Sequence, residues 1–152
     1  MTIFIKNRPF FFSHILVFLG SFMTFYSAAQ DCTVPNTLIN SRILLEIDGQ
    51  YTLLNPHAGH LQVFSFTRST LSVTILETAE TYSGPYQYQV LSPEVGLISS
   101  TIKQKETVFS DFNLVFICLE DGLGHYIYSQ DKGVTKPDIR QNTGNFFIFS
   151  NE

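Results

Sequence analysis

The chain has 152 residues, a formal net charge of −4 and an apolar content of 44%. This length leaves room for one small domain with a single core. Lys6 and Arg8 are the only Lys or Arg among the first 29 residues, so residues 30–152 hold the other seven, against 13 Asp and Glu. An acidic domain is repelled by phosphate backbones and by anionic lipid, so the composition argues against nucleic-acid binding.

Residues 1–29 have the pattern of an export signal. A basic stretch precedes an apolar run from Phe10 to Tyr26, and the following SAAQD contains small residues that suit cleavage after Ala29. A retained membrane anchor is the alternative, because the apolar run is near the minimum length for crossing a bilayer. We expect residues 30–152 to form one secreted, periplasmic or cell-surface domain.

The two cysteines, Cys32 and Cys118, both lie in this expected mature domain. In an oxidising compartment two such cysteines are most simply explained by one disulfide. The alternative is a pair of free thiols.

The first half of the domain predicts two β-hairpins. RILLEI (42–47) and QYTLL (50–54) flank Asp48-Gly49, a pair that favours a type I′ turn. Residues 61–67 and 70–77 alternate around Arg68-Ser69 and form the second predicted pair.

The second half predicts five more strands, separated by turn residues and by a polar connection over residues 131–144. The segment 111–120 is apolar on both faces, which is typical of a central strand. The predicted strands here are 86–91, 97–105, 111–120, 125–130 and 145–150.

Nine short strands without an amphipathic helix predict an all-β fold. A single antiparallel β-sandwich, Ig-like or jelly-roll-like, is the first expectation, because two sheets would share the available apolar side chains. A small up-and-down β-barrel with a ligand cavity is the alternative, because the same hairpins fit a meander.

The stretch FICLEDGLGHYIY (116–128) concentrates chemically active side chains near a glycine turn. If the loop comprised the four residues 121–124, Glu120 would face His125, and Cys118 would lie diagonally from that imidazole on the same face. A two-residue loop would change this register. A structural hairpin is the simpler interpretation, because a disulfide would occupy Cys118.

Metal binding has weak support in the sequence. His57 and His60 lie three residues apart in NPHAGH, and with His125 they are the candidate ligands for zinc or copper. A solvated turn explains the first two equally well, so we expect neither a metal nor another cofactor.

Two tyrosine pairs are the candidate partner-binding residues. Tyr86 and Tyr88 share one face of a predicted strand, and Tyr126 and Tyr128 share one face of another. Such rings would form a platform for a sugar or a protein, although tyrosines are also common in half-buried core positions.

The motifs of hydrolases, zinc proteases, phosphate-binding loops and dinucleotide enzymes do not occur in the sequence. We therefore expect a non-enzymatic secreted or surface-associated domain that binds a protein or glycan partner. A barrel that carries an apolar ligand is the alternative function.

Overall fold

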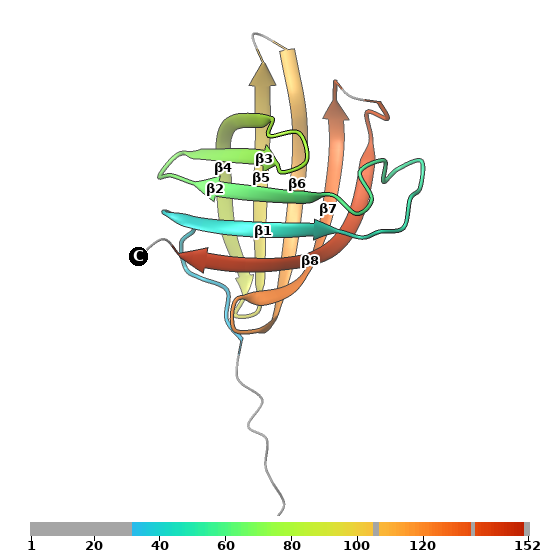
Figure 1. Ribbon diagram of the computed structural model, residues 1–152. Helices are drawn as coiled ribbons and strands as arrows, with labels where there is room; N and C mark the ends of the chain where they lie inside the picture. Colours follow the sequence, from blue (N-terminus) through green and yellow to red (C-terminus); the bar gives the residue numbers. More distant parts are fainter. Residues whose placement is uncertain (1–31, 105–106, 135, 151–152) are drawn as a thin grey trace, which may run out of the picture.

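The computed structural model describes residues 32–104, 107–134 and 136–150, which form one closed antiparallel barrel of eight strands (Figure 1). Each strand pairs with its neighbours in sequence, and β8 closes the barrel by pairing with β1. The strands are β1 (Ser41–Ile47), β2 (Leu61–Phe66), β3 (Thr70–Ile75), β4 (Thr81–Ser92), β5 (Val95–Gln104), β6 (Thr107–Glu120), β7 (Leu123–Gly133) and β8 (Arg140–Ser150).

The all-β prediction is confirmed, and the described residues contain no helix. The sandwich is not confirmed, because the strands close into the alternative architecture, an up-and-down barrel. The described part of the chain contains no helix that is long and apolar enough to cross a membrane. The predicted export signal, residues 1–29, lies outside the described residues.

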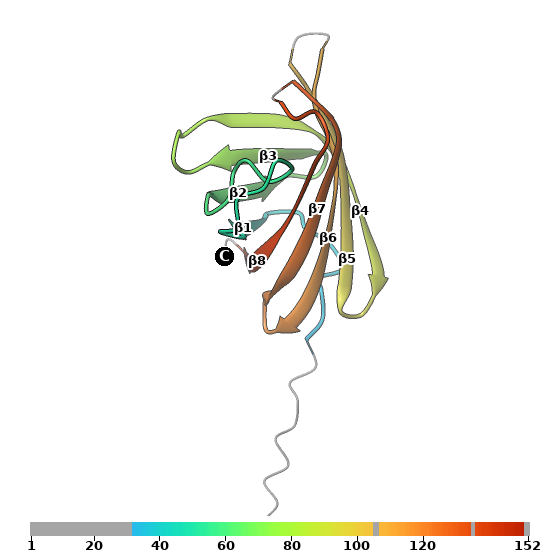
Figure 2. The same ribbon diagram turned by 90° about the vertical axis from the view of Figure 1, so that its right-hand side faces the viewer.

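Strands β1 to β3 run across the long strands β5 to β7, so the barrel is flattened into two crossed layers (Figures 1 and 2). Two bent strands join the layers. The first part of β4 pairs with β3 and its remainder with β5, whereas β8 pairs first with β7 and then with β1. Crossed layers bury alternating side chains as a sandwich does, so the local sequence pattern does not distinguish the two folds.

Glycines lie in the bent strands where backbones approach closely. A Cβ atom on Gly144 would lie 1.9 Å from the carbonyl oxygen of Glu46 on β1. A Cβ atom on Gly84 of β4 would lie 3.0 Å from the Cα of Ile102 on β5. Only a residue without a side chain fits at the β8 position without moving the β1 backbone.

The segment before β1 covers one end of the barrel. Val34 and Leu38 are buried in the hydrophobic core. The amide of Val34 donates to the Pro93 carbonyl at 2.8 Å, and the Tyr88 hydroxyl donates to the Pro35 carbonyl at 2.6 Å. These contacts hold the segment against the turn between β4 and β5, so this end is closed.

A disulfide between Cys32 and Cys118 fixes the start of the covering segment to β6, as the sequence predicted. The two Cα atoms are 5.6 Å apart and the residues are 86 positions apart in the chain. On the chain-entropy model a loop of this length stabilises the fold by roughly 4 kcal/mol.

The predicted hairpin over residues 42–54 is wrong, because β1 pairs with β2 and not with residues 50–54. The Asp48 carboxylate instead accepts a hydrogen bond from the Gln50 amide at 2.9 Å, and the Asn55 side chain donates to the carbonyls of Asp48 and Gln50. These side-chain bonds stabilise a loop in place of a two-residue turn.

The other predicted strands form, and β4 to β8 are all longer than expected. Residues 81–85, predicted as part of a loop, begin β4, and residues 140–144, predicted as part of a connection, begin β8. Both extensions consist mainly of polar or turn-forming residues, so the sequence pattern did not indicate strands there. Pairing with β3 and β7 satisfies their backbone groups.

Replacing Gly144 with alanine should destabilise the barrel by about 2 kcal/mol, because the added methyl group collides with the β1 backbone. Gly49→Ala is the matched control, since a Cβ atom there meets nothing within 4 Å. Urea unfolding followed by circular dichroism measures both variants. Equal midpoints would show that the contact between β8 and β1 tolerates a side chain.

Candidate functional site

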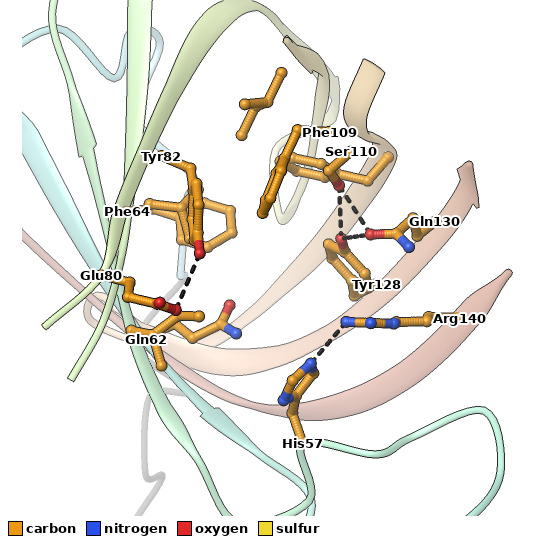
Figure 3. Close-up of a pocket in the computed structure, with 14 residues that line it drawn as sticks. His57, Gln62, Phe64, Glu80, Tyr82, Phe109, Ser110, Tyr128, Gln130 and Arg140 are labelled. Atoms are coloured by element: carbon orange, nitrogen blue, oxygen red, sulfur yellow. Dashed lines mark hydrogen bonds between the residues drawn. The ribbon is translucent and has the colours of Figure 1, made fainter. Parts of the chain in front are cut away.

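A cavity of about 190 Å³ lies inside the barrel at the end opposite the disulfide (Figure 3). The loops between β1 and β2 and between β3 and β4 contribute His57 and Glu80 to its wall. Its remaining lining comes from inward-facing strand residues. The covering segment closes the other end.

Aromatic and aliphatic side chains form one part of the wall. The Tyr82 ring stacks on Phe109 with ring centres 4.0 Å apart, and the Phe64 ring meets Phe112 edge to face at 5.9 Å. Such pairs stabilise one ring arrangement. The apolar lining residues are Phe64, Val73, Ile75, Ile102, Phe109 and Phe112.

A hydrogen-bonded cluster forms another part of the wall. The Gln130 side-chain oxygen accepts from the Ser110 hydroxyl at 2.9 Å and from the Tyr128 hydroxyl at 3.1 Å. Its amide nitrogen donates to the Asp138 carbonyl at 2.8 Å. Donors at one end and an acceptor at the other fix the orientation of this buried amide.

Arg140, the first residue of β8, places a guanidinium in the cavity wall although its exposed fraction is only 8%. Its Nε donates to the Pro137 carbonyl at 3.2 Å, and its Nη1 lies 2.6 Å from Nε2 of His57. Because a guanidinium only donates, His57 accepts through Nε2 and carries its own proton on Nδ1.

Burial and the neighbouring Arg140 charge lower the pKa of His57 from its ordinary value of 6.5. Burial raises the pKa of Tyr128 to about 12. At neutral pH the imidazole and the phenol are therefore both uncharged, and the fixed positive charge in this part of the wall belongs to Arg140.

The loop between β3 and β4 supplies carboxylates near the site. Glu80 lines the cavity and accepts a hydrogen bond from the Tyr82 hydroxyl at 3.0 Å. Glu77 accepts from the Leu61 amide at 2.7 Å, and this bond lowers the pKa of its carboxyl group. The His60 ring lies 4.0 Å from the same carboxylate.

The four candidate tyrosines face the barrel interior. Tyr126 is only 1% exposed, and Tyr86, Tyr88 and Tyr128 pack against the core. Tyr128 alone among them lines the cavity described above. Partner binding through the tyrosine pairs stays a prediction.

The three candidate metal-binding histidines do not form one cluster. His57 and His60 have ring centres 5.4 Å apart, whereas His125 is exposed on β7 opposite Ile117 and Asn145. Among the described residues, no group of three or more His, Cys, Asp and Glu is placed to hold a metal ion.

Of the two loops considered for this hairpin, the four-residue loop that would pair Glu120 with His125 does not form, because the turn between β6 and β7 comprises the two residues Asp121 and Gly122. Glu120 pairs with Leu123, and His125 pairs with Ile117. Gly122 has a φ angle of 71°, which glycine adopts readily and which permits the tighter turn. Cys118 is buried in the disulfide and His125 points outward.

Sequence reasoning missed most of the polar wall. Ser110, Gln130 and Arg140 lay at or beyond the ends of predicted strands, where polar residues resemble ordinary turn residues. Gln130 continues the alternation of Tyr126 and Tyr128, and this was the one available signal. Arg140 had no local signal, because its position depends on the pairing of β8 with β7.

Comparison with known proteins finds no match: no protein-family model fits the chain, and neither a curated protein nor a solved structure is significantly similar to it.

The His57→Gln variant should lose less stability than the wild type between pH 7.5 and pH 5.5. A histidine whose pKa is lower in the folded than in the unfolded protein contributes stability at pH values above 6.5, the pKa in the unfolded chain. This contribution is lost as the pH falls through the unfolded and then the folded pKa. Urea midpoints at both pH values measure the difference. Parallel losses in the two proteins would contradict a neutral, buried His57.

Proposed function

We propose that this protein binds a small, mainly apolar molecule inside its barrel. The supporting observation is the cavity of about 190 Å³, whose wall combines apolar side chains with a few fixed polar groups. Small-molecule sites in proteins have this composition, and the interior of a barrel is a frequent place for them.

The volume of the cavity limits the size of the ligand. A cavity of about 150 Å³ in an engineered protein core accepts benzene, so about 190 Å³ suits a molecule of one aromatic ring or a short aliphatic chain. The stacked pair of Tyr82 and Phe109 and the edge of Phe112 provide apolar contacts for such a body. Lipids with long chains exceed this space.

The proposed setting is an exported one. A disulfide persists in oxidising compartments, and the bond between Cys32 and Cys118 fits the periplasm or the cell exterior. An exported binding protein would capture its small molecule outside the cytoplasm.

Substituting Val73 with tryptophan should abolish binding of toluene, because the indole would fill the cavity that Val73 lines. Thr74→Trp is the matched control on the outer face of the same strand, and it should bind toluene as the wild type does. The chain contains no tryptophan, so emission at shorter wavelength from the Val73 variant also reports an enclosed indole. Binding is measured by saturation-transfer NMR. Absence of toluene binding by the wild type would refute the proposal.

Binding of a protein partner is a second candidate function, favoured by an apolar patch on the outer faces of β6, β7 and β8. Ladder pairing brings Val115 beside Ile127 and Leu123 beside Phe147, and Ile117, Leu123, Ile127 and Phe147 are exposed. Contiguous exposed apolar patches frequently mark interaction sites.

A photoreactive amino acid at Ile127 should cross-link one partner protein in cells that produce the chain naturally, whereas the same group at the exposed outer position Gln87 should not. The captured protein, once purified, should bind the wild type and the Gln87→Glu variant equally. It should bind Ile127→Glu about tenfold more weakly, because a buried unpaired carboxylate is costly. Equal affinity for all three proteins would exclude the patch as the interface.

A further inference from the structure

The two sides of the cavity wall differ in composition. In Figure 3, Ser110, Tyr128, Gln130 and Arg140 lie on one side, whereas Phe64, Tyr82 and the polar side chains of Gln62 and Glu80 lie on the other. A ligand with a polar group at Arg140 and an apolar body against the rings would contact both sides.

The polar side carries a positive charge at a fixed position. Arg140 is held from two directions, by the Pro137 carbonyl through Nε and by His57 through Nη1. A charge-assisted bond between a guanidinium and a carboxylate is about twice as strong as a neutral hydrogen bond. Because Arg140 is held in this way, little side-chain entropy would be lost on binding an anion.

The polar groups around Arg140 favour an anion over a cation. The Ser110 and Tyr128 hydroxyls both donate to the Gln130 oxygen, so this oxygen, which would attract a cation, is already engaged. His57 is neutral, and its Nε2 lone pair is directed at Arg140.

A smaller chamber of about 40 Å³ lies against the same arginine. Arg140, His57 and Tyr126 are among its lining residues. The Tyr126 hydroxyl is buried and has no hydrogen-bond partner among the described residues. A space of this size holds one water or the oxygen atoms of a small acid group, so the chamber extends the polar side toward the barrel core.

The opposite side limits the ligand to one acid group. The Glu80 carboxylate lies across the cavity from Arg140 and is held by the Tyr82 hydroxyl (Figure 3). A second carboxylate on the ligand would approach Glu80 and be repelled.

From these observations we infer that the ligand is a small monocarboxylic acid, with its carboxylate on Arg140 and a single-ring or short aliphatic body against Phe64, Phe109 and Phe112. This inference rests on the proposed function, because it assigns a chemical class to the ligand of the same cavity. The site is thus specific for an ionised acid over its neutral analogue.

Four probes of nearly equal size test the inference on the wild-type protein at neutral pH: benzoate, benzamide, benzylamine and toluene. Benzoate should bind about tenfold more tightly than benzamide, because only the acid makes a charge-assisted bond to Arg140. Benzylamine should bind most weakly. Affinities are measured by titration calorimetry, supported by NMR shifts of the Arg140 Nε signal on adding benzoate.

Arg140→Met should abolish the preference for benzoate over benzamide, so that the two probes bind with equal affinity. Arg42→Met is the matched control, because Arg42 lies over the Phe149 ring and does not line the cavity. Arg140→Lys retains the charge and should retain the preference for benzoate over benzamide. A merely structural arginine would alter the affinities of all probes together.

The outcomes separate the two proposals. If toluene binds and benzoate binds no more tightly than benzamide or benzylamine, acid recognition is wrong and the apolar cavity function stands. If none of the four probes binds, both proposals are wrong.

Discussion

The pairing of β8 with both β7 and β1 is the constraint on which the rest of this structure depends. It removes the two free edges that an eight-stranded meander would otherwise expose, and it requires β8 to cross from one layer to the other at Gly144. The same crossing places Arg140, at the start of β8, inside the barrel while the end of the strand closes it beside β1. Closure of the fold and formation of the polar wall therefore have one cause.

The two ends of the barrel differ because only one of them is covered. At the disulfide end, Leu38 and the rings of Phe116 and Phe146 fill the interior, and the bond between Cys32 and Cys118 holds the covering segment in place. At the other end, residues such as Gln130 and Arg140 are buried but hydrogen-bonded, and space remains between them and the aromatic rings. Buried polar groups contribute less to stability than apolar packing does, and their usual benefit is specificity for a ligand or a conformation. The apolar end with the disulfide and the polar end with the cavity are thus separated along one barrel.

Local patterns in the sequence predicted most strands and the disulfide, but not the closure or the site. Alternation identified β2 and β3 because their side chains face a core and solvent in turn. It failed at residues 50–54, where Leu53 is apolar but exposed in a loop held by Asp48 and Asn55. The choice between sandwich and barrel depends on whether β1 meets β8, a contact between the two ends of the domain that no local pattern encodes. Of the cavity's polar residues, His57 and Tyr128 were recognised as notable, but in the roles of metal ligand and partner platform. Arg140, which bonds to the His57 ring, lies 83 residues away from it in the sequence.

The central claim is that the barrel holds an accessible apolar cavity at the end opposite its disulfide. A crystal structure determined under xenon pressure tests it most directly, because xenon occupies apolar cavities without needing specific polar contacts. The account predicts a xenon atom inside the barrel between Phe64, Val73 and Phe112. A barrel in which these side chains touch one another and no xenon enters would contradict it.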